Sequence, residues 1–455
     1  MANNQEIELK LLVSKENLKK LLALDFVKQA IRPNSKQKRK LISSYYDTQD
    51  LALKDHGIAY RVRDKGDGTF EATVKTSQSS SGGISERLEL NLPLPEPKPV
   101  LAGFQDLGLK YDLEELAPEG VGCLFTVKVD RTIYLLDLGT ALVELALDKG
   151  KIIADKLSDP IDEIELELLE GDKATLLQFA AKLTSSVPMF VEKRSKFARG
   201  LALRGFNSDL KAPKVKLGEG LISQQLLALV SYHGDLLLQL QNKLLADKLT
   251  PLLVKKLYKQ SGYLLACGAL AQTMLAVDCH ICQEKLDQWQ RALKKLERLL
   301  YLQAAWQQLE EACKDILSKP VLGKKLNQAL AEAKTELLSL GQQGSLTAAY
   351  YSLLSRLLRY QPVEEAQALD LVDQALETWS KEPGHSQSLY YLAKATEGKH
   401  YSKLAAASKK QWQKEEQENL PKDLEQLLGQ LQGKSTSKYM SRDIGLLLGW
   451  LLAQK

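Results

Sequence analysis

Carboxylates recur at every second position in two segments of the chain. Residues 5–12 alternate Glu6, Glu8 and Lys10 with apolar residues. Residues 162–168 repeat the period with three acids, Glu163, Glu165 and Glu167. The side chains of a β-strand point alternately to the two faces of a sheet, so each segment would gather its charges on one face. Clustered carboxylate oxygens are suited to a hard divalent cation such as Mg²⁺ or Mn²⁺.

Cationic side chains follow the same period between these two segments. Arg61 and Arg63 share one face of residues 60–63, Lys75 ends residues 70–75, and Arg87 lies within residues 85–90. Guanidinium and ammonium groups bind the non-bridging oxygens of phosphates, and arginine often does so through two parallel hydrogen bonds. These residues indicate an anionic, phosphate-containing ligand.

A further acidic segment, residues 141–148, places Glu144 and Asp148 in phase. Asp148 could equally be a turn residue, because Lys149 and Gly150 follow it. Many antiparallel strands with one charged face indicate a β-barrel whose charged faces point inward. A charged interior is costly unless acids, bases, metals or a polyanion neutralise one another there. The pattern therefore predicts a ligand inside the barrel, whereas any one such segment alone could be a half-exposed strand.

The chain changes character near residue 205. Before it, strand-like runs are separated by expected hairpin turns at 65–68, 137–139 and 149–150, by expected helices at 14–24, 48–56, 172–185 and 192–204, and by a flexible loop at 77–83. After it, residues 217–453 are rich in Leu, Ala, Gln, Lys and Glu with helical spacing, which predicts an all-α bundle. The expected fold class is α+β, an antiparallel barrel followed by a helical domain.

Composition sets broad limits on function. The 455-residue chain has a formal net charge of +5 and five cysteines, which fits an anionic ligand and implies no disulfide framework. No apolar run reaches about 18 residues, and the first ten residues do not resemble a signal peptide. We expect a cytoplasmic protein that binds neither nucleic acid nor a membrane.

The charged strands, taken in order with the closing segment 194–200, resemble the CYTH domain of the triphosphate tunnel metalloenzymes. This family comprises inorganic triphosphatases, thiamine triphosphatases, class IV adenylate cyclases and some RNA triphosphatases. The resemblance implies that the triphosphate is held by seven cations, Lys10, Arg61, Arg63, Lys75, Arg87, Arg131 and Lys196. A surface arginine is the alternative reading of Arg131.

The same resemblance assigns the acids to divalent metal ions, Mg²⁺ or Mn²⁺. Glu165 and Glu167, with Glu163 nearer the strand entrance, would hold the phosphate-bound metal. Glu6 and Glu8 would position the attacking water together with a second metal, and Glu144 and Asp148 would be supporting ligands. The implied function is hydrolysis of inorganic triphosphate to diphosphate and phosphate.

The helical remainder resembles a CHAD domain, which implies polyphosphate as a partner. The usual basic pattern is missing after His233, where Gly234-Asp235-Leu236 follows. We expect a CYTH-like domain at 1–204, a linker at 205–216 and a CHAD-like domain at 217–455. Two alternatives stay open: a nucleoside- or thiamine-triphosphate enzyme of the same family, including a cyclase, and a non-catalytic polyphosphate-binding scaffold.

Overall fold

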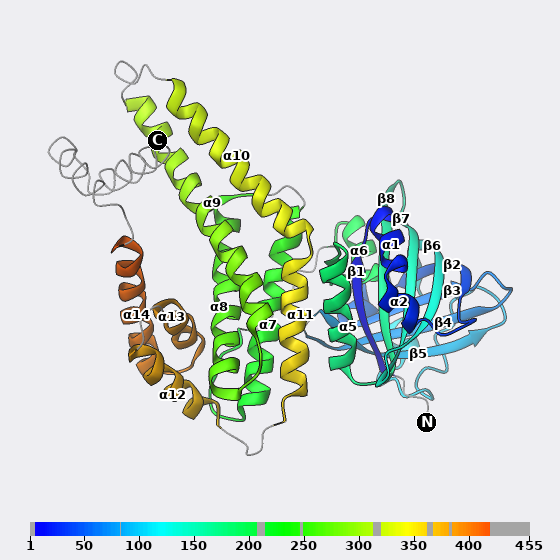
Figure 1. The fold of residues 1–455 in the computed structure, drawn as a ribbon. Helices are drawn as coiled ribbons and strands as arrows, with labels where there is room; N and C mark the ends of the chain where they lie inside the picture. Colours follow the sequence, from blue (N-terminus) through cyan, green and yellow to red (C-terminus); the bar gives the residue numbers. More distant parts are fainter. Residues whose placement is uncertain are drawn as a thin grey trace. The chain divides into compact units, whose positions relative to one another are not determined.

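The structure is a computed structural model that describes residues 5–81, 83–206, 214–245, 249–312, 320–361, 367–381 and 385–418. The chain divides into two compact units, Met1–Lys214 and Val215–Lys455 (Figure 1). Residues 207–213 of the expected linker lie outside the described part.

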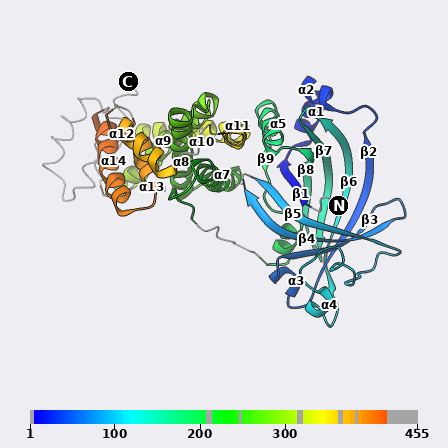
Figure 2. The same cartoon turned by 90° about the horizontal axis from the view of Figure 1, so that it is seen from below.

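Eight antiparallel strands of the first unit close into a barrel. The strands are β1 (Gln5–Leu12), β2 (Gln37–Asp47), β3 (Ile58–Asp64), β4 (Phe70–Ser81), β5 (Ile84–Leu94), β6 (Gly122–Asp137), β7 (Ala141–Ala154) and β8 (Leu157–Gly171). Their order is β5-β4-β3-β2-β6-β7-β8-β1, and pairing of β5 with β1 completes the circle (Figure 2). A two-residue strand, β9 (Phe190–Val191), pairs with β1 outside this circle. The predicted α+β fold class, a barrel followed by many helices, is confirmed.

The first unit also contains helices. They are α1 (Lys15–Ala23), α2 (Asp25–Ala30), α3 (Ala52–Asp55), α4 (Leu113–Leu116), α5 (Lys173–Ser186) and α6 (Lys196–Leu203). The hydroxyl of Ser14 caps α1 by accepting a hydrogen bond from the Asn17 N–H. α3 is shorter than the expected 48–56 helix because the buried Asp47 carboxylate accepts the Leu53 and Lys54 N–H groups. α6 begins four residues later than expected, at Lys196, and Ser195 is its cap.

A predicted loop, at 77–83, and a predicted turn, at 149–150, lie in strands instead. Residues 77–81 of the expected loop belong to β4, which stays paired with β5 as far as Ser81 opposite Ile84; Gly82 lies outside the described residues. Lys149 and Gly150 lie within β7, and a β-carbon at Gly150 would fall 1.9 Å from the carbonyl oxygen of Lys128. This glycine therefore permits a close strand approach, and the chain turns later, between β7 and β8.

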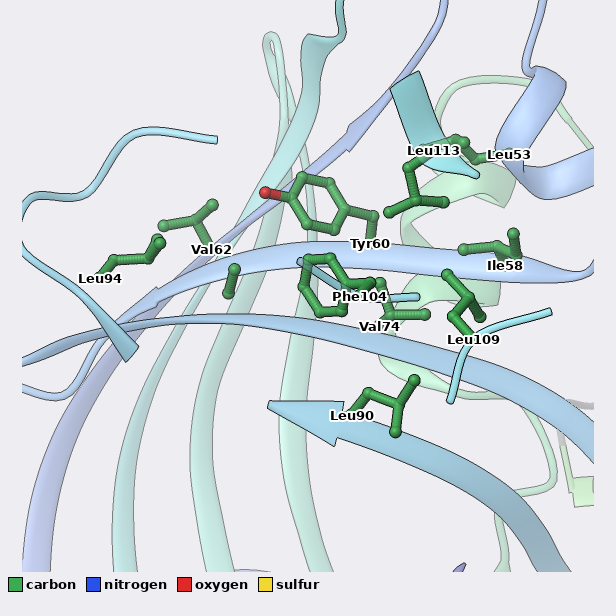
Figure 3. Close-up of a cluster of buried hydrophobic side chains, with 11 residues drawn as sticks. Leu53, Ile58, Tyr60, Val62, Val74, Leu90, Leu94, Phe104, Leu109 and Leu113 are labelled. Atoms are coloured by element: carbon green, nitrogen blue, oxygen red, sulfur yellow. The ribbon is translucent and has the colours of Figure 1, made fainter. Parts of the chain in front are cut away.

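The apolar core beside β3, β4 and β5 lies on the outer face of the barrel (Figure 3). Tyr60, Val74 and Leu90 point outward from these strands and pack with Phe104 from the following connection. The Tyr60 hydroxyl donates a 2.8 Å hydrogen bond to the carbonyl oxygen of Val100, which ties this connection to the sheet. Because alternate residues face opposite ways, the charged residues of the same strands face the barrel interior.

The described residues of the second unit form helices and the connections between them. Its helices are α7 (Ile222–Leu245), α8 (Pro251–Leu275), α9 (His280–Ala312), α10 (Pro320–Gln342), α11 (Ser345–Arg359), α12 (Ala368–Lys381), α13 (Ser386–Ala395) and α14 (Lys399–Glu418). Gly234 and Gly262 allow close packing, since a β-carbon at either would fall within 2.5 Å of the Tyr350 or Tyr391 ring. Among the described helices, none has the length and apolar character needed to cross a membrane.

Candidate active site

The interior of the barrel brings the predicted site residues together. Strand alternation places them on the inner faces of β1 and β3–β8, and α6 contributes the last one from the edge of the barrel. The set comprises Glu6, Glu8, Lys10, Arg61, Arg63, Lys75, Arg87, Arg131, Glu144, Asp148, Glu163, Glu165, Glu167 and Lys196. Each is buried or half-buried, so these charges interact in a largely desolvated space.

Lys196 occupies a cage of three carboxylates. Its Nζ lies 2.8 Å from Asp148 Oδ2, 2.6 Å from Glu163 Oε1 and 2.7 Å from Glu165 Oε1. Arg131 closes the cage from β6, since its guanidinium donates to both oxygens of Asp148 and to Glu165. Asp148 is therefore a buried member of β7, and its turn reading is wrong. The surface reading of Arg131 is wrong as well.

The cage holds its groups in their charged forms. Burial would raise the pKa of Asp148, but the charges of Lys196 and Arg131 bring that pKa below its usual value. Burial likewise opposes ionisation of Glu165, yet Lys10, Lys196 and Arg131 lower its pKa well below the ordinary range. The pKa of Lys196 is raised well above normal because Asp148 and Glu165 outweigh its desolvation.

A second ion cluster lies between β1, β3, β4 and β5. Lys75 Nζ lies 2.5 Å from Glu6 Oε1 and 2.7 Å from Glu89 Oε2, and Arg61 approaches the other oxygen of Glu89 at 3.6 Å. Burial opposes ionisation of Glu89, but Lys75 and Arg61 lower its pKa below the usual range. This cluster holds Lys75 and Arg61 in place across four strands.

Glu8 on β1 lies between Lys10 and Arg87, and Lys10 links it to the carboxylate cage. Its Oε1 accepts hydrogen bonds from Lys10 Nζ at 2.8 Å and from Arg87 Nη1 at 3.3 Å. Lys10 also reaches Glu165 Oε1 at 3.1 Å. Burial would raise the pKa of Glu8, but chiefly the charge of Lys10 lowers it, so this carboxylate is ionised.

Arg63 is a half-buried cation without a carboxylate partner within 4 Å among the described residues. Its Nε donates a 3.0 Å hydrogen bond to Ser43 Oγ. Burial lowers its pKa to about 10, and the like charges of Arg61 and Arg131 act in the same direction. An anion placed here would relieve this unfavourable arrangement.

Glu144 and Glu167 are carboxylates without an ion pair in the part of the chain that the structure covers. They lie directly opposite each other on β7 and β8. Burial raises the pKa of Glu167 to about 8, aided by the negative charges of Glu6 and Glu144. The second oxygen of Glu6, Oε2, is buried and has no hydrogen-bond partner. Glu144 and Glu167 therefore lack a cationic partner and Lys75 occupies only one oxygen of Glu6, so a cation would complement these three acids.

Four inner residues were not predicted as site residues. Glu89 aligns Lys75 and Arg61, and its alternation with Arg87 was the signal that could have identified it. Arg199 donates to Glu163 at 3.0 Å, from one turn after Lys196 on α6. The remaining two, Tyr45 and Arg39, lie on β2. The inner face of this strand carries few charged residues, so its sequence shows no charged alternation that would have identified them.

Residues 4–201 match the family model described as the CYTH domain. The N-terminal unit contains a CYTH domain. An inorganic triphosphatase of Haemophilus influenzae is 33% identical over 201 residues, which are 44% of this chain and 55% of that protein. The present chain therefore matches about half the length of this relative.

Solved structures show a partial likeness to the chain. A Hippeastrum protein described as having a dominant triphosphatase activity is 22% identical, with a TM-score of 0.32 over 46% of this chain and all of that one. A Pyrococcus horikoshii protein is 21% identical, with a TM-score of 0.30 over 44% of this chain and 99% of that one. The CHAD-like character of the helical unit stays a prediction.

Proposed function

We propose that the barrel unit hydrolyses inorganic triphosphate to diphosphate and phosphate with the help of a divalent cation. One observation carries the proposal: Arg63, a cation without a carboxylate, shares the barrel interior with Glu144 and Glu167, which are carboxylates without a cation. A phosphate chain that carries a bound divalent cation complements both kinds of group at once.

The donor set fits Mg²⁺ or Mn²⁺. We assign the ion to Glu6, Glu144 and Glu167. Glu144 and Glu167 have no ion pair among the described residues, and Glu6, whose Oε1 is held by Lys75, keeps a second buried oxygen, Oε2, without a partner. Such an ion offsets the negative charge that develops during phosphoryl transfer. Oxygens of Asp148, Glu163 and Glu165 also lie within 4.8 Å of one another. Lys196 already neutralises that second group, which makes it the weaker candidate.

The chain's own side chains then have separate tasks. Arg61, Arg63, Lys75 and Arg87 bind the non-bridging oxygens, while Arg131, Lys196 and Lys10 extend the positive surface at the carboxylate cage. Glu8 is ionised and held by Lys10, so its carboxylate can accept a hydrogen bond from the attacking water and orient it toward the terminal phosphorus. Because ion pairs, and for Arg63 the hydrogen bond to Ser43, fix these groups beforehand, little reorganisation is needed on binding.

The test is phosphate release from inorganic triphosphate, measured with Mg²⁺, with Mn²⁺ and in excess chelator. ATP and thiamine triphosphate are assayed in parallel. We expect metal-dependent release that is fastest with inorganic triphosphate. Release that persists in chelator would remove the metal from the proposal. A preference for ATP or thiamine triphosphate would replace the substrate, and binding without turnover would favour a scaffold.

A further inference from the structure

Arg39 faces the barrel interior but has no task in the proposed reaction. On β2 it is in phase with Leu41, Ser43 and Tyr45, which are buried, whereas the intervening residues are more exposed. It is paired directly with Arg131 of β6, whose guanidinium points into the carboxylate cage. Paired residues of neighbouring strands share a face of the sheet, so Arg39 points inward too.

The charge of Arg39 is not compensated by the protein. Like charges opposite each other on neighbouring strands are destabilising, and Arg131 is already engaged with Asp148 and Glu165. Arg39 donates to Gln37 at 2.8 Å, and among the described residues it has no carboxylate within 4 Å. Its charge is felt inside the barrel, since burial raises the pKa of Glu144 while Arg131 and then Arg39 oppose that rise.

Arg39 lies toward the solvent end of the barrel interior. The inner end of β2 is closed by aromatic packing, in which the Tyr45 ring stacks on Phe125 at 4.9 Å and on Phe197 at 5.7 Å. Ser43, which accepts a hydrogen bond from Arg63, lies four positions after the exposed Arg39 along the strand. Four strand residues span about 13 Å. A chain of phosphoryl groups bound at Arg63 and extending outward would therefore reach the level of Arg39 and its strand partner Arg131.

We propose that Arg39 is a specificity-determining residue that binds phosphoryl groups beyond the third in a linear polyphosphate. The substrate class of the barrel then includes inorganic tetraphosphate and longer chains, and the outer groups add affinity through Arg39. This inference rests on the proposed function, because it takes the phosphate chain to be seated at Arg63. A competing role is purely electrostatic: Arg39 would tune Glu144 and affect every substrate equally.

The experiment compares Arg39→Gln with Lys38→Gln in the full chain. Lys38 is the neighbouring residue on the outer face of β2, so it provides the same charge change outside the barrel. KM and kcat are measured for inorganic triphosphate and tetraphosphate. We expect Arg39→Gln to raise KM for tetraphosphate about fivefold, the scale of one exposed ion pair, with less than a twofold change for triphosphate. The difference should shrink at high salt.

Three results would overturn the inference. An equal change for both substrates would assign Arg39 to tuning of Glu144, an equal effect of Lys38→Gln would assign the change to net charge, and no change in either KM would remove Arg39 from binding. Calorimetric dissociation constants for the two polyphosphates in chelator separate this inference from the proposed function. If the protein binds both chains but hydrolyses neither, the proposed function fails, and the ratio of the two dissociation constants in Arg39→Gln decides the role of Arg39.

Discussion

Replacing Lys196 by Met tests the charge balance of the barrel interior. Lys196 is 9% exposed, and its ammonium contacts three carboxylates that are each 8% exposed or less. Removing one partner of a buried ion cluster costs about 3–5 kcal/mol, because the remaining charge is left uncompensated. Arg131, Lys10 and Arg199 still contact the same acids, so we expect the lower end of this range. For a unit of this size, about 3 kcal/mol lowers the melting temperature by about 6–12 °C.

The loss should depend on pH with a definite sign. In the wild-type protein the pKa values of Asp148 and Glu165 are depressed, so their ion pairs stabilise the fold above the unfolded pKa and this contribution is lost as the pH falls. In Lys196→Met the ion pairs of Asp148 and Glu165 stabilise the fold less, even at neutral pH. The difference in melting temperature between Lys196→Met and wild type should therefore be largest near neutral pH and shrink toward about pH 4.

Thermal unfolding followed by circular dichroism in chelator measures both effects. Lys156→Met is the matched control, because Lys156 is exposed in the turn between β7 and β8 and should change stability by less than about 0.5 kcal/mol. When Mg²⁺ replaces the chelator, it should restore part of the stability lost in Lys196→Met. The three carboxylates that lose their contact with Lys196 lie close enough together to share an ion. If Lys196→Met melted like Lys156→Met at pH 7.5, the carboxylate cage would not exist in solution.

Four further outcomes follow from the same geometry. Glu8→Gln should lower kcat by at least about 100-fold while the circular dichroism spectrum is unchanged, and normal turnover would remove Glu8 from the chemistry. Arg63→Ala should weaken triphosphate binding by about 1.5–3 kcal/mol in calorimetry without lowering the melting temperature, because this half-buried cation lacks a carboxylate. Glu167→Gln should raise the melting temperature in chelator at pH 8 but not near pH 4: a raised folded-state pKa favours the fold below the unfolded pKa, and this is lost as the pH rises through about 8. A fragment of residues 1–214 should retain triphosphatase activity, since all the candidate residues precede Lys214, and a folded but inactive fragment would refute this.

The period of the sequence predicted the faces of the strands but not the partners of their charges. Alternation alone identified Glu6, Glu8 and Lys10 as one face of β1, because side-chain direction is a local property of a strand. The partner of Lys196 is not local: its carboxylates lie 31 to 48 positions earlier in the chain. Which of them it meets depends on the register of β7 and β8 and on the cap that starts α6.

The loop predicted at 77–83 and the turn predicted at 149–150 were wrong for related reasons. Serine- and glycine-rich composition indicates a loop only where the backbone finds no partner, and residues 77–81 find one in β5. A strand bonded through its backbone needs no apolar period of its own. Gly150 looked like a turn glycine because sequence cannot show that its missing side chain makes room for the carbonyl of Lys128.

The placement of the apolar core explains how the fold tolerates so charged an interior. Ion pairs taken out of water contribute little net stability, since their attraction mainly offsets the cost of desolvation. On β3, β4 and β5 the large buried side chains, such as Tyr60, Val74 and Leu90, lie on the outer face under the connection that carries Phe104 (Figure 3). Their burial stabilises the barrel without filling it. The interior can therefore keep an uncompensated cation at Arg63 and uncompensated acids at Glu144 and Glu167, which a ligand would complete.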